Sequence, residues 1–123
     1  MISGSSITVE DLRISGLYAS PYTEYKMTRD GFVYGYVRAA NYEIDNGKIH
    51  DIGHATGWCY IYSKTGEKLY TVDEFSNISA YHDSAKQMYY LHAGDYIRIY
   101  VYTQGRDPVE NTGAFIGSVI YLN

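Results

Sequence analysis

Three aromatic side chains in the segment 58–62 are the residues whose type and spacing best suit binding chemistry. Trp58, Tyr60 and Tyr62 alternate along the segment, so they share one face of an expected strand. A row of aromatic rings on a sheet can stack on sugar rings, because each ring is apolar on its face and carries a polar edge. The other interpretation, which we favour, is that these rings pack on the sheet or on another subunit.

Two histidines and one cysteine invite a comparison with zinc sites. His50, His54 and Cys59 are of the types that ligate zinc. Their spacing matches neither a zinc finger nor a metalloprotease, and no helical register brings the histidines together. We therefore predict that the histidines lie in solvated loops and that Cys59 is a small, buried hydrophobic residue. We expect no bound metal and no cofactor.

The patterns of the common catalytic classes are missing from the sequence. It contains no Gly-x-Ser-x-Gly elbow, phosphate loop or dinucleotide fingerprint. The 14 acidic residues single out no pair for glycoside cleavage. Asp45-Asn46-Gly47 is expected to form a turn rather than a calcium loop, and Asp95 to hydrogen-bond locally within its own turn. The chain is predicted not to be an enzyme.

The stretch from Leu91 to Tyr102 indicates what positions the aromatic residues. A Gly94-Asp95 turn leads into a segment in which two kinds of side chain alternate, which predicts a strand with one aliphatic and one aromatic face. A solvated sheet face normally carries small polar and charged residues, so the tyrosine face is expected to be covered by a subunit or a ligand. The aliphatic set is Ile97, Ile99 and Val101, and the aromatic or basic set is Tyr96, Arg98, Tyr100 and Tyr102.

Length, charge and composition narrow the class of protein. The 123 residues suffice for one domain, and 16 tyrosines suit interfaces and half-exposed surfaces. The net charge is −4 and no basic run exists, which argues against binding nucleic acid. No apolar run is long enough to insert into a membrane, and Met1 to Ser6 lacks the regions of a signal peptide.

The remaining segments predict short strands and no helix. Strands are expected over 24–28, 32–39, 58–62, 68–72, 87–91, 96–103 and 114–122, after a short extended segment within 7–14. The polar segments 41–57, 73–84 and 104–113 are expected to be loops, the first with a turn at Asn46-Gly47. About eight short strands without a helix are typical of an all-β sandwich or jelly roll.

The order of several motifs resembles that of a known family. Leu91-His92-Ala93-Gly94-Asp95 before an alternating strand, and the closing Gly113 to Tyr121 segment with its Phe115-Ile116-Gly117, are similar to the complement-type globular head. Arg29 to Tyr34 resembles an earlier strand of that family, and Trp58 to Glu67 its middle hairpin. This family shares a jelly-roll fold with the tumour-necrosis-factor ligands. The resemblance covers roughly residues 22–123.

The resemblance implies a homotrimer with aromatic sheet faces around a threefold axis. We expect a jelly roll of about 8–10 antiparallel strands over residues 17–123, after an N-terminal lead or attachment segment over 1–16. The expected role is a structural or adhesion module on a phage particle or other extracellular surface. Its expected partners are other fibre or virion proteins, and an adhesion module would in addition contact a host glycan. The alternative is a monomeric carbohydrate-binding β-sandwich that uses Trp58, Tyr60 and Tyr62. The axis candidates are Tyr34, Tyr36, Tyr96, Tyr100, Tyr102 and Phe115.

Overall fold

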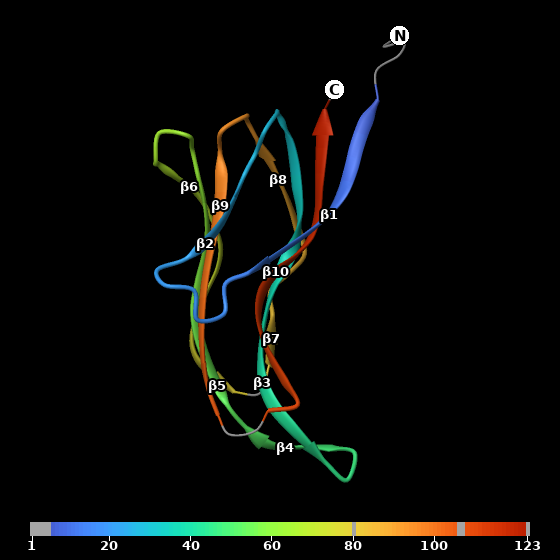
Figure 1. Ribbon diagram of the computed structural model, residues 1–123, viewed down its shortest axis with the longest axis vertical. Coiled ribbons are helices and arrows are strands. Elements are labelled where there is room, and N and C mark those ends of the chain that lie inside the picture. Colours follow the sequence, from blue (N-terminus) through green and yellow to red (C-terminus); the bar gives the residue numbers. More distant parts are fainter. Residues whose placement is uncertain (1–5, 80, 106–107, 123) are drawn as a thin grey trace.

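The computed structural model describes residues 6–79, 81–105 and 108–122, apart from the side chains at 45 and 50–52. Within these ranges the chain forms ten strands and no helix. The strands make two antiparallel sheets that lie face to face as two layers (Figure 1). The expected all-β sandwich is therefore confirmed.

The first sheet is built around the long strand β3 (Gly31–Asp45). On one side β3 pairs with β10 (Glu110–Leu122), which in turn pairs with β1 (Ile7–Ser15). On its other side β3 pairs in succession with three shorter strands. These are β8 (Gln87–Leu91), β7 (Tyr81–Asp83) and β4 (Lys48–Ile52).

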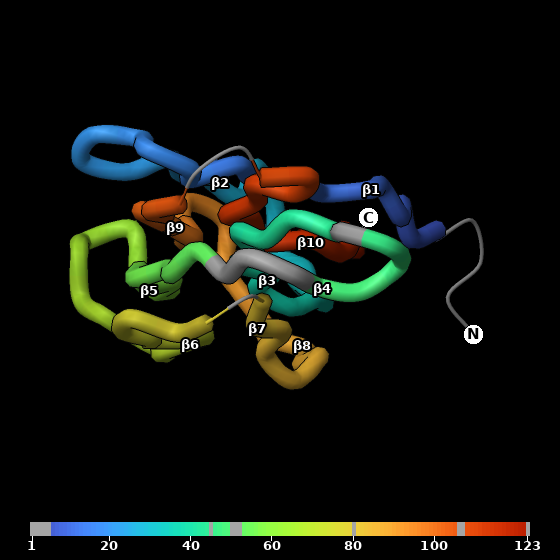
Figure 2. The backbone as a smooth tube through the Cα atoms, turned by 90° about the horizontal axis from the view of Figure 1, so that it is seen from below, coloured from blue at the N-terminus to red at the C-terminus, as the bar shows by residue number. Residues whose placement is uncertain are grey.

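The second sheet has four strands in the order β2-β9-β5-β6. Their bounds are Thr23–Lys26 for β2, Tyr96–Gln104 for β9, His54–Tyr62 for β5 and Lys68–Ser79 for β6. Seen from below, these strands lie together on one side of the molecule, facing the first sheet (Figure 2).

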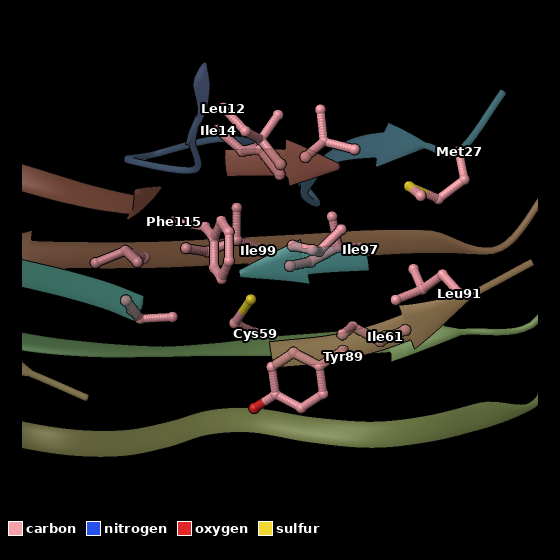
Figure 3. Packing of buried hydrophobic residues seen from close by; sticks show 14 of the residues in the cluster. Leu12, Ile14, Met27, Cys59, Ile61, Tyr89, Leu91, Ile97, Ile99 and Phe115 are labelled. Atoms are coloured by element: carbon pink, nitrogen blue, oxygen red, sulfur yellow. The ribbon is translucent and has the colours of Figure 1, made fainter. Parts of the chain in front are cut away.

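The core lies between the two sheets and confirms the alternation expected for 96–103. Ile97, Ile99 and Val101 are fully buried, and their neighbours in β5, Cys59 and Ile61, are also at 0% exposure. Figure 3 shows these aliphatic side chains packed with residues of the first sheet. Burial of apolar surface of this kind is the main favourable contribution to folding.

Two of the three segments expected to be loops are mostly strand. In the segment 41–57, β3 continues to Asp45, β4 follows, and β5 begins at His54; in 73–84, β6 continues to Ser79. These segments are polar in composition because the end of β3 and the edge strand β6 face solvent on much of their surface, and not because they are loops. The expected turn at Asn46-Gly47 is confirmed by positive φ angles of 52° and 76°.

Strand β1 belongs to the sandwich, whereas the sequence placed residues 1–16 outside the domain. Every residue from Ile7 to Ser15 has a partner in β10. Leu12 and Ile14 turn inward and are 8% and 4% exposed. The alternation of this segment is short, and so its pairing could not be recognised from the sequence.

Asp95 holds the turn before β9 by the expected local hydrogen bond and by a second one to the hairpin turn that follows β5. The backbone N–H of His92 donates to its Oδ2 at 2.8 Å, and the N–H of Lys64 donates to its Oδ1 at 3.1 Å. These bonds satisfy a carboxylate that is only 4% exposed, and they fix the start of the strand that carries the tyrosines.

Candidate functional site

The outer surface of the second sheet carries most of the predicted aromatic residues. Their side chains alternate with the buried set on β5 and β9 and face each other across the ladder: Trp58 lies opposite Tyr100, Tyr60 opposite Arg98 and Tyr62 opposite Tyr96. We call this surface the aromatic face. It consists of Trp58, Tyr60, Tyr62, Tyr96, Arg98, Tyr100 and Tyr102.

The rings of the aromatic face pack on one another. Trp58 and Tyr60 are stacked, with centroids 4.9 Å apart and an interplanar angle of 13°. Tyr62 and Tyr96 are stacked in the same way at 5.4 Å and 22°. Lys68 Nζ lies 4.1 Å from the centroid of Tyr60. Such contacts stabilise the folded chain without a partner.

Arg98 lies in the aromatic face and contacts three tyrosine rings and one carboxylate. Its guanidinium carbon lies 4.0 Å from the ring centroid of Tyr22, 4.6 Å from that of Tyr96 and 5.2 Å from that of Tyr62. Its Nε donates to Glu24 Oε1 at 3.0 Å. The cation is thus paired with a carboxylate and surrounded by rings, so the centre of this face needs no external ligand to satisfy it.

The stacking limits what the aromatic face can bind. A sugar platform needs a ring with a free flat side, but Trp58 covers one side of the Tyr60 ring and Lys68 lies over the same ring. The Tyr60 hydroxyl donates to Glu74, and this hydrogen bond, with some burial, raises the pKa of Tyr60 to about 12. Tyr60 therefore acts within the chain as a packing residue and a hydrogen-bond donor.

The outer surface of the first sheet is largely apolar and more exposed, although Phe32 and Tyr90 pack on each other at 5.2 Å and Lys86 Nζ lies 5.6 Å from the Tyr36 centroid. Rows of side chains cross it in register: Val9 lies beside Ile120, which lies beside Phe32, which lies beside Tyr90. Val9 is 59% exposed, Met88 55%, Tyr90 41% and Tyr34 40%. We call this surface the apolar face. It consists of Val9, Phe32, Tyr34, Tyr36, Met88, Tyr90, Ile116 and Ile120.

An ion cluster borders the apolar face where β3, β7 and β10 meet. Arg38 donates to Glu110 through Nε at 2.7 Å and through a terminal nitrogen at 2.8 Å, and to Asp83 at 3.0 Å. The Tyr42 hydroxyl also donates to Glu110 at 2.8 Å. Chiefly because of the Arg38 hydrogen bond, the pKa of Glu110 falls from 4.5 to about 2 and that of Arg38 rises. The cluster is ionised and internally paired at neutral pH.

The six axis candidates do not share one surface. Tyr34 and Tyr36 lie on the apolar face, and Tyr96, Tyr100 and Tyr102 lie on the aromatic face of the other sheet. The assignment of Phe115 to the trimer axis is wrong. Its ring is 0% exposed and packs between the sheets with the core residues labelled in Figure 3, because its position in β10 points inward.

The aliphatic part of the apolar face was not predicted from the sequence. Ile116 and Ile120 alternate with Phe115 and Val119 in β10, so their side chains emerge on the opposite surface. This alternation is visible in the sequence, but the choice of Phe115 as an axis candidate requires the opposite phase. Met88 and Tyr90 carried a weaker signal, since β8 is a strand of only five residues.

The residues compared with zinc ligands are placed as follows. His54 is exposed, and the side chain of His50 lies outside the described residues. Cys59 is fully buried as predicted, and burial, with the nearby Asp73 charge, raises the pKa of its thiol. Among the described residues, no three His, Cys, Asp or Glu side chains come together as a metal site. The described part of the chain also has no helix able to cross a membrane.

The function of this chain has to be inferred from its two sheet faces, because comparisons with known proteins gave no match. Neither models of protein families nor curated proteins nor solved structures gave a match to this chain.

Proposed function

We propose that this protein is a structural or adhesion module that assembles into a homotrimer through its apolar face. The observation that carries assembly through this face is its exposure, since Val9, Met88, Tyr90 and Tyr34 are each 40% exposed or more; the number of three copies follows from the family resemblance. The aromatic face, whose rings and cation satisfy one another, is then turned outward. Covering the apolar face with further copies of the chain removes its side chains from water.

The area of the apolar face supports this assignment. With ~200 Å² for each large side chain, the exposed fractions amount to roughly 400–600 Å² of apolar surface. The largest apolar patch of a typical monomeric protein is about 300–600 Å² and often functional, so the apolar face lies in the upper part of that range. A stable contact buries about 800 Å² on each partner, so the apolar face supplies a large part of one such contact.

The charges around the apolar face also suit contact between identical chains. Among the side chains that the structure describes, we place three positive and three negative ones on this side of the first sheet, whereas the whole chain carries a net charge of −4. Identical copies repel through a charged surface, and a surface of balanced charge avoids that cost. The six residues are Asp11, Arg13, Arg38, Asp83, Lys86 and Glu110.

The strand order supports a jelly roll. If the short strands β4 and β7 are set aside, the two sheets read β1-β10-β3-β8 and β2-β9-β5-β6. This is the order expected for eight strands wound as two Greek keys. The display of the module on a phage particle or fibre follows from the family resemblance alone and stays a prediction.

The proposal is tested by placing a carboxylate on each face in turn. We expect Tyr34→Asp and Met88→Asp to convert a trimer into a folded monomer, because a charge buried in an apolar contact costs several kcal/mol. Tyr102→Asp is the matched control, since Tyr102 is 46% exposed on the aromatic face. Sedimentation velocity measures the mass and circular dichroism the fold. Dissociation by the Tyr102 variant alone, or a monomeric wild-type protein, would refute the assignment.

The alternative, a monomeric carbohydrate-binding β-sandwich, makes a different prediction about Trp58. The stacked Trp58 and Tyr60 rings and the cation over Tyr60 argue for packing within the chain. Under our proposal, the emission of Trp58 stays unchanged when neutral glycans are added. A saturable shift in this emission, abolished in Tyr60→Ala, would favour the alternative.

A further inference from the structure

A two-stranded arm extends from the lower end of the first sheet. Strand β10 pairs with β3 only as far as Tyr42, so beyond this residue β3 is paired with β4 alone. Figure 1 shows the tip of this hairpin projecting past the first sheet, on the side away from the second sheet. We call the end of β3 after Tyr42, the turn and β4 the arm. It projects on the side of the apolar face.

The turn of the arm is built to hold a fixed shape. Asn46 and Gly47 both have positive φ, at 52° and 76°, which is the conformation of the tight two-residue hairpin turn that favours Asn-Gly. Asp45 and Lys48 pair directly on either side of it. The arm is therefore a preorganised ribbon, and little conformational entropy is lost when it contacts a partner.

The arm exposes two isoleucines directly opposite each other. Ile44 and Ile49 are register partners and are 50% and 46% exposed. The register shifts between Tyr42 and Ile44, but the extra residue lies on β4, where three positions separate Ile49 from Ile52. On β3, Ile44 follows Tyr42 by two residues, so both lie on the same side of that strand. The Tyr42 hydroxyl reaches Glu110 on the outer surface of the first sheet, and hence the isoleucine pair continues the side of the sheet that bears the apolar face.

We propose that the arm packs against a second copy of this chain, with Ile44 and Ile49 as its anchors. This inference rests on the proposed homotrimer. Three observations indicate that the partner of the arm is another copy of the chain. The isoleucines lie on the side of the apolar face, and the arm projects on that same side. In addition, the apolar face alone offers less area than the about 800 Å² that a stable contact buries on each partner. The cluster between the two apolar regions holds one cation and two carboxylates, and each carboxylate is hydrogen-bonded to Arg38, so covering the cluster leaves neither carboxylate without a partner.

The test is the double variant Ile44→Ser, Ile49→Ser in the full chain. Both side chains are about half exposed and lie outside the core, so we expect the variant to fold. The protomer concentration at half-assembly, measured by light scattering over a dilution series, is expected to rise roughly tenfold or more. Leu69→Ser is the matched control, because Leu69 is 42% exposed on β6 in the other sheet.

The outcomes separate this inference from the proposed function. Weaker assembly of the arm variant, with the control unchanged, supports the arm contact. Unchanged assembly of the arm variant, while Tyr34→Asp still dissociates the trimer, overturns the arm contact and leaves the trimer in place. A wild-type protein that is monomeric at all concentrations overturns both.

Discussion

Replacing Phe115 by alanine is expected to destabilise the sandwich rather than to separate subunits. The ring is fully buried, and its neighbours in the adjacent strands, Ile14 and Val37, are buried as well. Truncation of a buried Phe removes its burial energy and leaves a cavity that a close-packed core closes only in part. The loss is about 3–5 kcal/mol, which is a large fraction of the 5–15 kcal/mol typical of one domain.

Urea unfolding followed by circular dichroism measures this loss. Wild type and variant are compared at one protomer concentration, because assembly makes the apparent stability concentration-dependent. Phe115→Leu keeps most of the volume and is expected to lose less, which provides a folded comparison if the alanine variant does not fold. An unchanged unfolding midpoint in Phe115→Ala together with a fall in mass would refute the placement of this ring in the core.

Three further predictions follow from single sites. The Cys59 thiol is buried and its pKa is raised, so a water-soluble disulfide reagent is expected to label it only after urea is added; rapid labelling in buffer would contradict its burial. Glu110→Gln is expected to lose about 1–2 kcal/mol at pH 7. In the folded chain the pKa of Glu110 is lowered from 4.5 to about 2. The greater stability of the wild type over Glu110→Gln should therefore be complete above pH 4.5 and disappear as the pH falls through 2. Urea midpoints of both proteins across this range test it, and a stability difference that does not change with pH would argue against the ion pair. Gly117→Ala is expected to destabilise by about 1–3 kcal/mol, because a Cβ there would lie 1.9 Å from the backbone oxygen of Tyr34; Ser118→Ala is the control for thermal melting.

The fold class could be read from the sequence where a strand has one buried face. Ile97, Ile99 and Val101 alternate with tyrosines, and this local pattern survives in the structure. It fails for β6 and the end of β3, because a strand exposed on both faces needs no alternation and resembles a loop in composition. The pairing of β1 depends on a partner more than a hundred residues away, at Tyr121 for Thr8, which no local pattern reveals.

The candidate site could be predicted only in part. Alternation correctly gathered Trp58, Tyr60 and Tyr62 on one side of a strand. It gave no means of assigning Tyr34 and Tyr100 to different sheets, since that depends on strand order. Phe115 was assigned to the wrong side of β10, because Ile116 and Phe115 are both apolar and either phase of the alternation was acceptable.

The mass of the wild-type protein in solution tests the central claim most directly. Light scattering after size exclusion, over a range of concentrations, distinguishes one chain of 14.0 kDa from an assembly. The proposed homotrimer predicts a mass of three times 14.0 kDa. A mass of 14.0 kDa at every concentration would contradict the account, because the exposed Val9, Met88 and Tyr90 would then have no partner copy to cover them.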